Sequence, residues 1–289
     1  MSEDLVQKVD LMKREIDALQ IAMTERAKPW YRNISILLSV IALLFSFGTT
    51  YVSYRRTAMQ DIQNSRQELR GLLQRLSALP KENVDIRRKY VDDPASMNLV
   101  GGFINQENAL LARQAAELAR KIPSDLVSGT EYYAIAIALQ NSYDLSGAEE
   151  FLRYSAQASK DFNTEIAALR FTANLQFVQG RPEAGRVEYQ KALNIFSKYP
   201  GYDPYTKTST NVWTELAWAF SEAGVGALSF AHQHVENAKA LVNALPRSPG
   251  GDMLNAQVSQ AEMQFATGQP ITSPGTGSPL GIAPLSGPK

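Results

Sequence analysis

Apolar residues recur along most of the chain at spacings of three and four, which is the periodicity of one face of an α-helix. No run alternates between apolar and polar residues as a half-buried strand would. The pattern therefore predicts an all-α protein. Over residues 102–267, Ala-rich stripes are separated by Pro and Gly and predict a helical domain. Its expected helices are 103–121, 130–142, 145–159, 163–179, 182–197, 209–223, 226–244 and 251–267.

One stretch, residues 33–54, is apolar on every face. It has 22 residues without a charge, and such a helix is about 33 Å long, against about 30 Å for the hydrocarbon core of a bilayer. A cleaved signal peptide begins with a short basic segment, whereas here 32 charged and polar residues come first. A helix buried in a protein core is rarely uncharged over this length. We expect a single transmembrane helix. Interface residues flank it: Trp30, Tyr31, Arg32, Tyr51, Tyr54, Arg55 and Arg56.

The sequence predicts the orientation of this helix in the membrane less strongly than it predicts the helix itself. Basic residues are nearly balanced on the two sides of the span, so the positive-inside rule gives almost a tie. A short N-terminal tail without a signal peptide more often stays in the cytoplasm. We therefore expect a cytoplasmic N-terminus and an extracytoplasmic C-terminal domain.

Heptad patterns flank the span on both sides. Before it, residues 1–28 carry an a/d row with steps of 4, 3, 4, 3 and 4, formed by Leu5, Val9, Met12, Ile16, Leu19 and Met23. A coiled coil fits this narrow row better than the alternative, a helix lying on lipid, because residues 1–32 hold six basic and six acidic residues.

After the span, residues 57–79 show a second pattern. Ile62, Leu69 and Leu76 form one row of seven-residue steps, and Leu72 and Leu79 form another. We expect a coiled-coil stalk that ends at Pro80, followed by a linker over residues 80–101. Two such seams predict a parallel homo-oligomer.

The amino-acid composition argues against several classes of function. Lys and Arg total 29, as do Asp and Glu, so no broadly basic surface is available for nucleic acid. The chain has no Cys, and its two histidines, His232 and His234, point to different sides of a helix, so we expect no metal site. No phosphate-binding or nucleophile motif occurs. We therefore expect no enzyme, no catalytic residue and no cofactor. Residues 268–289 contain five prolines and are predicted to be disordered.

The helical domain resembles the tetratricopeptide-repeat family. In residues 180–193, Gly185, Tyr189 and Ala192 occupy the places of the small, large and small residues in that motif's second helix. The corresponding triplets elsewhere are Ala148, Leu152 and Ser155, and Ala231, Val235 and Ala238, the last after an insertion of about two residues and without a glycine turn in register. Trp213 to Phe220 resembles a first helix. The resemblance implies three repeats over residues 129–242, stacked as an α-solenoid; a generic bundle is the alternative.

The resemblance also implies a peptide-binding groove lined by first helices. Arg170 and Asn174, one helical turn apart, resemble half of a carboxylate clamp, although Arg170 as a solvated charge and Trp218 as a core residue are the alternatives. We expect an anchored, self-associating scaffold that binds proteins or extended peptides; a structural membrane organiser and a helper of envelope-protein assembly or secretion are alternatives. The groove positions are Tyr133, Ile137, Gln140, Asn141, Arg170, Asn174, Phe177, Asn211, Thr214, Trp218 and Glu222.

Overall fold

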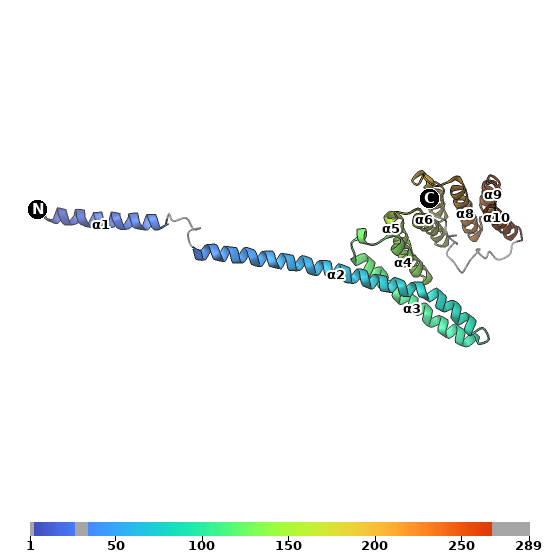
Figure 1. The fold of residues 1–289 in the computed structure, drawn as a ribbon, viewed down its shortest axis with the longest axis horizontal. Coiled ribbons are helices and arrows are strands. Elements are labelled where there is room, and N and C mark those ends of the chain that lie inside the picture. The colour runs from blue at the N-terminus through green and yellow to red at the C-terminus, as the bar shows by residue number, and fades with distance from the viewer. Residues whose placement is uncertain (1–2, 27–33, 268–289) are drawn as a thin grey trace. The chain divides into compact units, whose positions relative to one another are not determined.

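The computed structural model describes residues 3–26 and 34–267, and over these residues it is all-helical, with ten α-helices and no strand (Figure 1). The predicted tail at 268–289 and the interface residues Trp30, Tyr31 and Arg32 lie outside the described residues. The helices are α1 Glu3–Arg26, α2 Ile34–Lys89, α3 Pro94–Lys121, α4 Gly129–Asn141, α5 Leu145–Ala158, α6 Phe162–Val178, α7 Pro182–Leu193, α8 Pro204–Gly224, α9 Leu228–Asn243 and α10 Pro249–Thr267.

The chain divides into two compact units, Met1–Gln63 and Asn64–Lys289. The first unit holds α1 and the apolar beginning of α2. An 18-residue window of α2 has a mean hydropathy of 1.6, and none of it is buried. The described part of the chain thus contains one exposed helix that is long and apolar enough to cross a membrane.

The second unit begins with the rest of α2, and here two predictions are wrong. Pro80 lies inside α2, which continues to Lys89, and the expected linker is largely helical because α3 already begins at Pro94. A proline inside a helix removes one backbone hydrogen bond. Burial of the neighbouring Leu76 and Leu79 in the domain core holds the helix together across that gap.

The leucines that were expected to form a coiled-coil stalk pack instead in the core of their own domain. Leu69, Leu76 and Leu79 are only 0–8% exposed and belong to one core cluster with residues of α3, α4, α5 and α6. Heptad spacing does not distinguish a seam between chains from a helix that packs within its own domain. These leucines therefore cannot form the predicted coiled-coil stalk without unfolding the core.

From α4 onward the helices pack as sequential pairs, α4 with α5, α6 with α7, and α8 with α9, followed by α10. The first helices also contact one another, α4 with α6, α6 with α8, and α8 with α10. No comparable contact joins α5 to α7 or α7 to α9. The first helices thus form a closely packed inner row, and α5, α7 and α9 lie outside it.

The turns within the three pairs have the same structure. In each, one residue has a positive φ: Tyr143 (62°), Gly180 (74°) and Gly226 (79°). The amide of the residue that follows it bonds the carbonyl five positions earlier, as in Asp144 to Leu139, which is the Schellman pattern. The third pair therefore has its glycine turn in register, contrary to the prediction, and the turn from α8 to α9 is as long as the turn from α6 to α7, without the expected insertion.

The second-helix positions singled out in the sequence are packing positions. Each triplet begins five residues after the positive-φ residue, and all nine side chains or glycines are buried. At Gly185 an added Cβ would lie 2.9 Å from the Ala173 carbonyl oxygen and would overlap the ring of Phe177. Only glycine allows α6 and α7 to approach this closely.

Candidate functional site

The predicted groove residues separate into three groups. Tyr133, Ile137, Gln140, Arg170, Asn174 and Asn211 are half-buried along α4, α6 and α8, and Asn141 is exposed at the end of α4. Phe177, Thr214, Trp218 and Glu222 are buried in contacts between helices. The last four cannot contact a ligand in this conformation. The prediction that they line a groove is therefore wrong, because a helix of the inner row shares its face with neighbouring helices on both sides.

Arg170 is fixed by α8, the next helix of the inner row. Its Nε donates to Thr214 Oγ1 at 3.0 Å, and its Nη2 donates to the Thr210 carbonyl at 2.6 Å and to Thr214 Oγ1 at 2.7 Å. Thr214 Oγ1 in turn donates to the Thr210 carbonyl at 2.9 Å. The guanidinium is thus held in one orientation, and its Nη1 has no hydrogen-bond partner among the described residues.

The charge of Arg170 is not neutralised. Across residues 3–26 and 34–267, no carboxylate lies within ion-pair distance of it, whereas five other arginines form such pairs, namely Arg66, Arg75, Arg120, Arg181 and Arg186. Burial lowers the pKa of Arg170 to about 10, so the side chain remains a cation at neutral pH. The inner face therefore contains a desolvated positive charge whose only partners are neutral oxygens.

The other half-buried polar residues predicted to line the groove are neutral. Tyr133 on α4 packs edge-on against Phe171 with ring centroids 6.0 Å apart, and burial raises its pKa to about 12, so its phenol stays protonated. Asn211 Oδ1 is buried without a partner in the part of the chain that the structure describes. Asn174 Nδ2 donates to Ser221 Oγ at 3.2 Å, which fixes that amide between α6 and α8.

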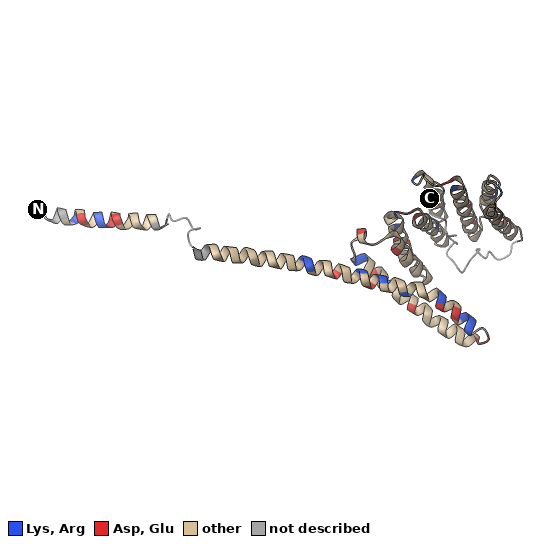
Figure 2. Ribbon diagram, viewed as in Figure 1, with Lys and Arg blue, Asp and Glu red and all other residues tan. Residues whose placement is uncertain are grey.

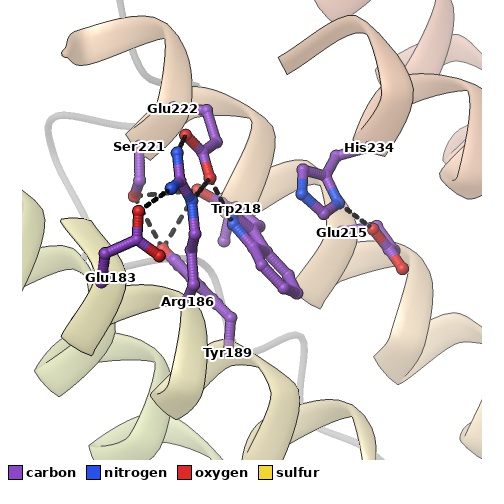
Figure 3. Close-up of polar contacts among 9 residues, drawn as sticks. Glu183, Arg186, Tyr189, Glu215, Trp218, Ser221, Glu222 and His234 are labelled. Carbon is purple, nitrogen blue, oxygen red and sulfur yellow. Dashed lines mark hydrogen bonds and ion pairs between the residues drawn. The ribbon is translucent and has the colours of Figure 1, made fainter. Parts of the chain in front are cut away.

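Trp218 forms the centre of a buried network that links α7, α8 and α9 (Figure 3). Its indole is stacked between Tyr189, with centroids 5.4 Å apart, and His234, with centroids 4.0 Å apart. Its Nε1 donates to Glu222 Oε1 at 2.9 Å. Tyr189 of α7 makes a further contact with α8, because its hydroxyl lies 2.8 Å from Ser221 Oγ.

Glu222 is fully buried and is held by Arg186. Arg186 Nε and Nη2 donate to its two oxygens at 2.7 and 2.8 Å. Burial alone would raise the pKa of Glu222, but the hydrogen bonds from Arg186 and Trp218 outweigh it and hold that pKa below its usual value. A second buried carboxylate, Glu215, lies 2.6 Å from His234 Nδ1.

The sequence contained a signal for this network that was missed. Glu215 and Glu222 stand seven residues apart in a stripe that is otherwise apolar, and a carboxylate at a buried position requires a charged or hydrogen-bonding partner. In the structure Arg186 and His234 meet that requirement. His234 therefore has a structural role, and within the described residues no group of His, Asp and Glu is arranged to hold a metal ion.

No protein-family model matches the chain, and no match is found among curated proteins or solved structures.

Arg170 stands apart from the buried network because its charge has no counterion within the described chain. What this surface can do chemically is bind an anionic group in a fixed orientation, through the Nη1 edge of one guanidinium.

Proposed function

We propose that this protein is a membrane-anchored adaptor whose tetratricopeptide-like domain binds an extended peptide along its inner row of helices. The observation that carries the proposal is Arg170, a half-buried cation with no carboxylate partner among the described residues. A partly desolvated charge is unfavourable unless a counter-charge reaches it. A carboxylate of the bound peptide would supply that charge.

The geometry around Arg170 favours such a ligand. Thr210 and Thr214 hold its guanidinium before any ligand arrives, so binding loses little side-chain entropy. The Nη1 edge is the free donor among the described residues, and the protonated phenol of Tyr133 on α4, which interacts electrostatically with Arg170, is a second donor. Hydrogen bonds between a guanidinium and a carboxylate are about twice as strong as bonds between neutral groups.

The exposed apolar part of α2 supports a single membrane span as the anchor. We propose a cytoplasmic N-terminus and an extracytoplasmic domain. Self-association through α1 belongs to the same proposal, because Val9, Met12, Ile16, Leu19 and Met23 are all exposed along one face of that helix. Several copies held together would let weak peptide sites act jointly.

Peptide selection would test the groove. The full chain in detergent micelles is screened against a library of random dodecapeptides, and the selected sequences are synthesised with a free side-chain or terminal carboxylate and with the corresponding amide. Arg170→Gln should weaken binding of the carboxylate form by about tenfold or more, which corresponds to about 1.4 kcal/mol. The amide form should bind weakly to both proteins.

Arg153→Gln is the matched control, because Arg153 is an exposed arginine on α5, outside the inner row. It should leave affinity unchanged. Equal affinity of the parent and Arg170→Gln for every selected carboxylate peptide would contradict the proposed site.

A further inference from the structure

Helix α3 has an apolar face that nothing in the described chain covers. Leu99, Phe103 and Leu110 are 63%, 61% and 58% exposed. At about 100° per residue these three positions lie within about 40° of one another. The residues of α3 that pack into the core, such as Ala112, Ala115 and Ala119, fall on the opposite side of the helix.

The same face lacks charge. Between Pro94 and Ala112 the only charged residue is Glu107, and its carboxylate is held by Arg75 of the same chain, with Nε to Oε1 at 2.7 Å. Figure 2 shows this beginning of α3 almost without coloured residues, whereas the neighbouring part of α2 carries several of both signs. An end helix of a helical-repeat domain normally presents a polar outer face to water. The outer face of α3 is instead typical of a contact surface.

The spacing of the face identifies the kind of contact. Leu99, Phe103, Gln106 and Leu110 follow steps of 4, 3 and 4, which is the a/d spacing of a seam between two helices. The seam ends at the next position of the pattern, which is Arg113. Gly102 lies about 80° from the centre of this row, and an added Cβ there would meet no atom within 4 Å. Its missing side chain leaves room for a second helix to approach.

We propose that α3 packs against α3 of a second copy of this chain, parallel and in register. A face without free charge meets its own copy without like-charge repulsion. Gln106 has no hydrogen-bond partner within the described residues, and a carboxamide is both a donor and an acceptor, so it can pair with Gln106 of a second copy. In an antiparallel pair it would face Phe103 and remain unsatisfied, which costs free energy and favours the parallel arrangement.

This contact is independent of the proposed peptide groove and of the seam proposed for α1. It lies on the outer side of α3 rather than on the inner row, and it uses none of the groove residues. It also replaces the predicted stalk, whose leucines are buried inside the chain. Self-association is thus assigned to α3 rather than to α2.

Disulfide crosslinking tests the contact directly, because the chain has no cysteine. Phe103→Cys, Leu110→Cys and Asn105→Cys are each prepared in the full chain in detergent micelles, on a background carrying Ile16→Lys to disable any α1 seam. Asn105 is the matched control because it is exposed on the same helix, about 140° away from the seam. On mild oxidation with copper phenanthroline, Phe103→Cys and Leu110→Cys should form dimers at least about tenfold faster than Asn105→Cys.

Three results would overturn the proposal. Equal crosslinking of all three variants would indicate random collision, and no crosslinking at the seam would mean that lipid or another protein covers the face. Faster crosslinking between Leu99→Cys and Leu110→Cys chains than within either would indicate an antiparallel pair. As a second measurement on the same Ile16→Lys background, Phe103→Glu should convert the detergent-solubilised dimer to monomer in mass photometry while leaving the far-UV circular dichroism unchanged.

Discussion

Glu222 is stable at a fully buried position only because Arg186 and Trp218 satisfy its two oxygens. Removing one partner of such a pair leaves an uncompensated buried charge. We expect Arg186→Ala to lower the free energy of unfolding by about 3–5 kcal/mol. Thermal unfolding of the full chain in detergent, followed by tryptophan fluorescence, measures the effect.

Lys191→Ala is the control for that variant, since Lys191 forms an exposed ion pair with Glu188 on the same helix. Its effect should stay within about 0.5 kcal/mol. The double variant Arg186→Met with Glu222→Leu should recover most of the loss, because two apolar side chains replace the pair without leaving a charge. A double variant as unstable as Arg186→Ala would contradict this interpretation of the network.

The same carboxylate predicts a pH dependence. The pKa of Glu222 is lower in the folded chain than its ordinary value of 4.5, so the unfolded chain binds a proton more readily. The stability that Glu222 contributes is therefore complete above about pH 4.5 and is lost as the pH falls through its folded pKa. Glu222→Gln should flatten the profile of melting temperature between pH 5 and 3.5 relative to the parent. An unchanged slope would contradict the assignment.

At the scale of the elements, the turns are the most regular feature. Tyr143 occupies the positive-φ position that glycine occupies in the other two pairs, and a non-glycine residue is strained there. We expect Tyr143→Gly to stabilise the domain by about 1 kcal/mol and Gly180→Ala to destabilise it by a similar amount. Melting temperatures of the two variants should move in opposite directions from that of the parent; a shift in the same direction would refute the argument.

Most helices could be predicted because their signals are local. The expected bounds of the helices from α4 to α7 and of α9 differ from the observed ones by a few residues, since caps, glycine turns and three-four spacing all lie within a few residues of each boundary. The course of α2 past Pro80 could not be predicted. It depends on Leu76 and Leu79 packing in a core shared with distant helices, which no local pattern reveals.

The site was predictable only in part, for a related reason. Spacing places Arg170, Thr214 and Trp218 on inner-row helices, but the sequence does not show which of them the neighbouring helices cover. Thr214 and Trp218 are covered, whereas Arg170 keeps one free edge because its other donors are bound to α8. Exposure within one helix pair depends on its contacts with the neighbouring pairs.

At the scale of the whole molecule, the apolar part of α2 allows a topology test. With tags at both termini, protease added to spheroplasts of a bacterial expression host should digest the C-terminal domain and leave the N-terminal tag intact. Detergent lysis, which should expose both tags, is the control. Protection of the domain together with loss of the N-terminal tag would reverse the proposed orientation and direct the search for peptides to the cytoplasm.

The position of Leu69, Leu76 and Leu79 has a consequence for proteolytic release. A protease that cut after Leu79 would leave the core of the domain without these three side chains, so the released fragment would lose stability. A cut between Arg56 and Gln63 would instead free a fragment that retains all three. Whether the domain can be shed as a folded, diffusible protein therefore depends on where cleavage falls within about 25 residues of one helix.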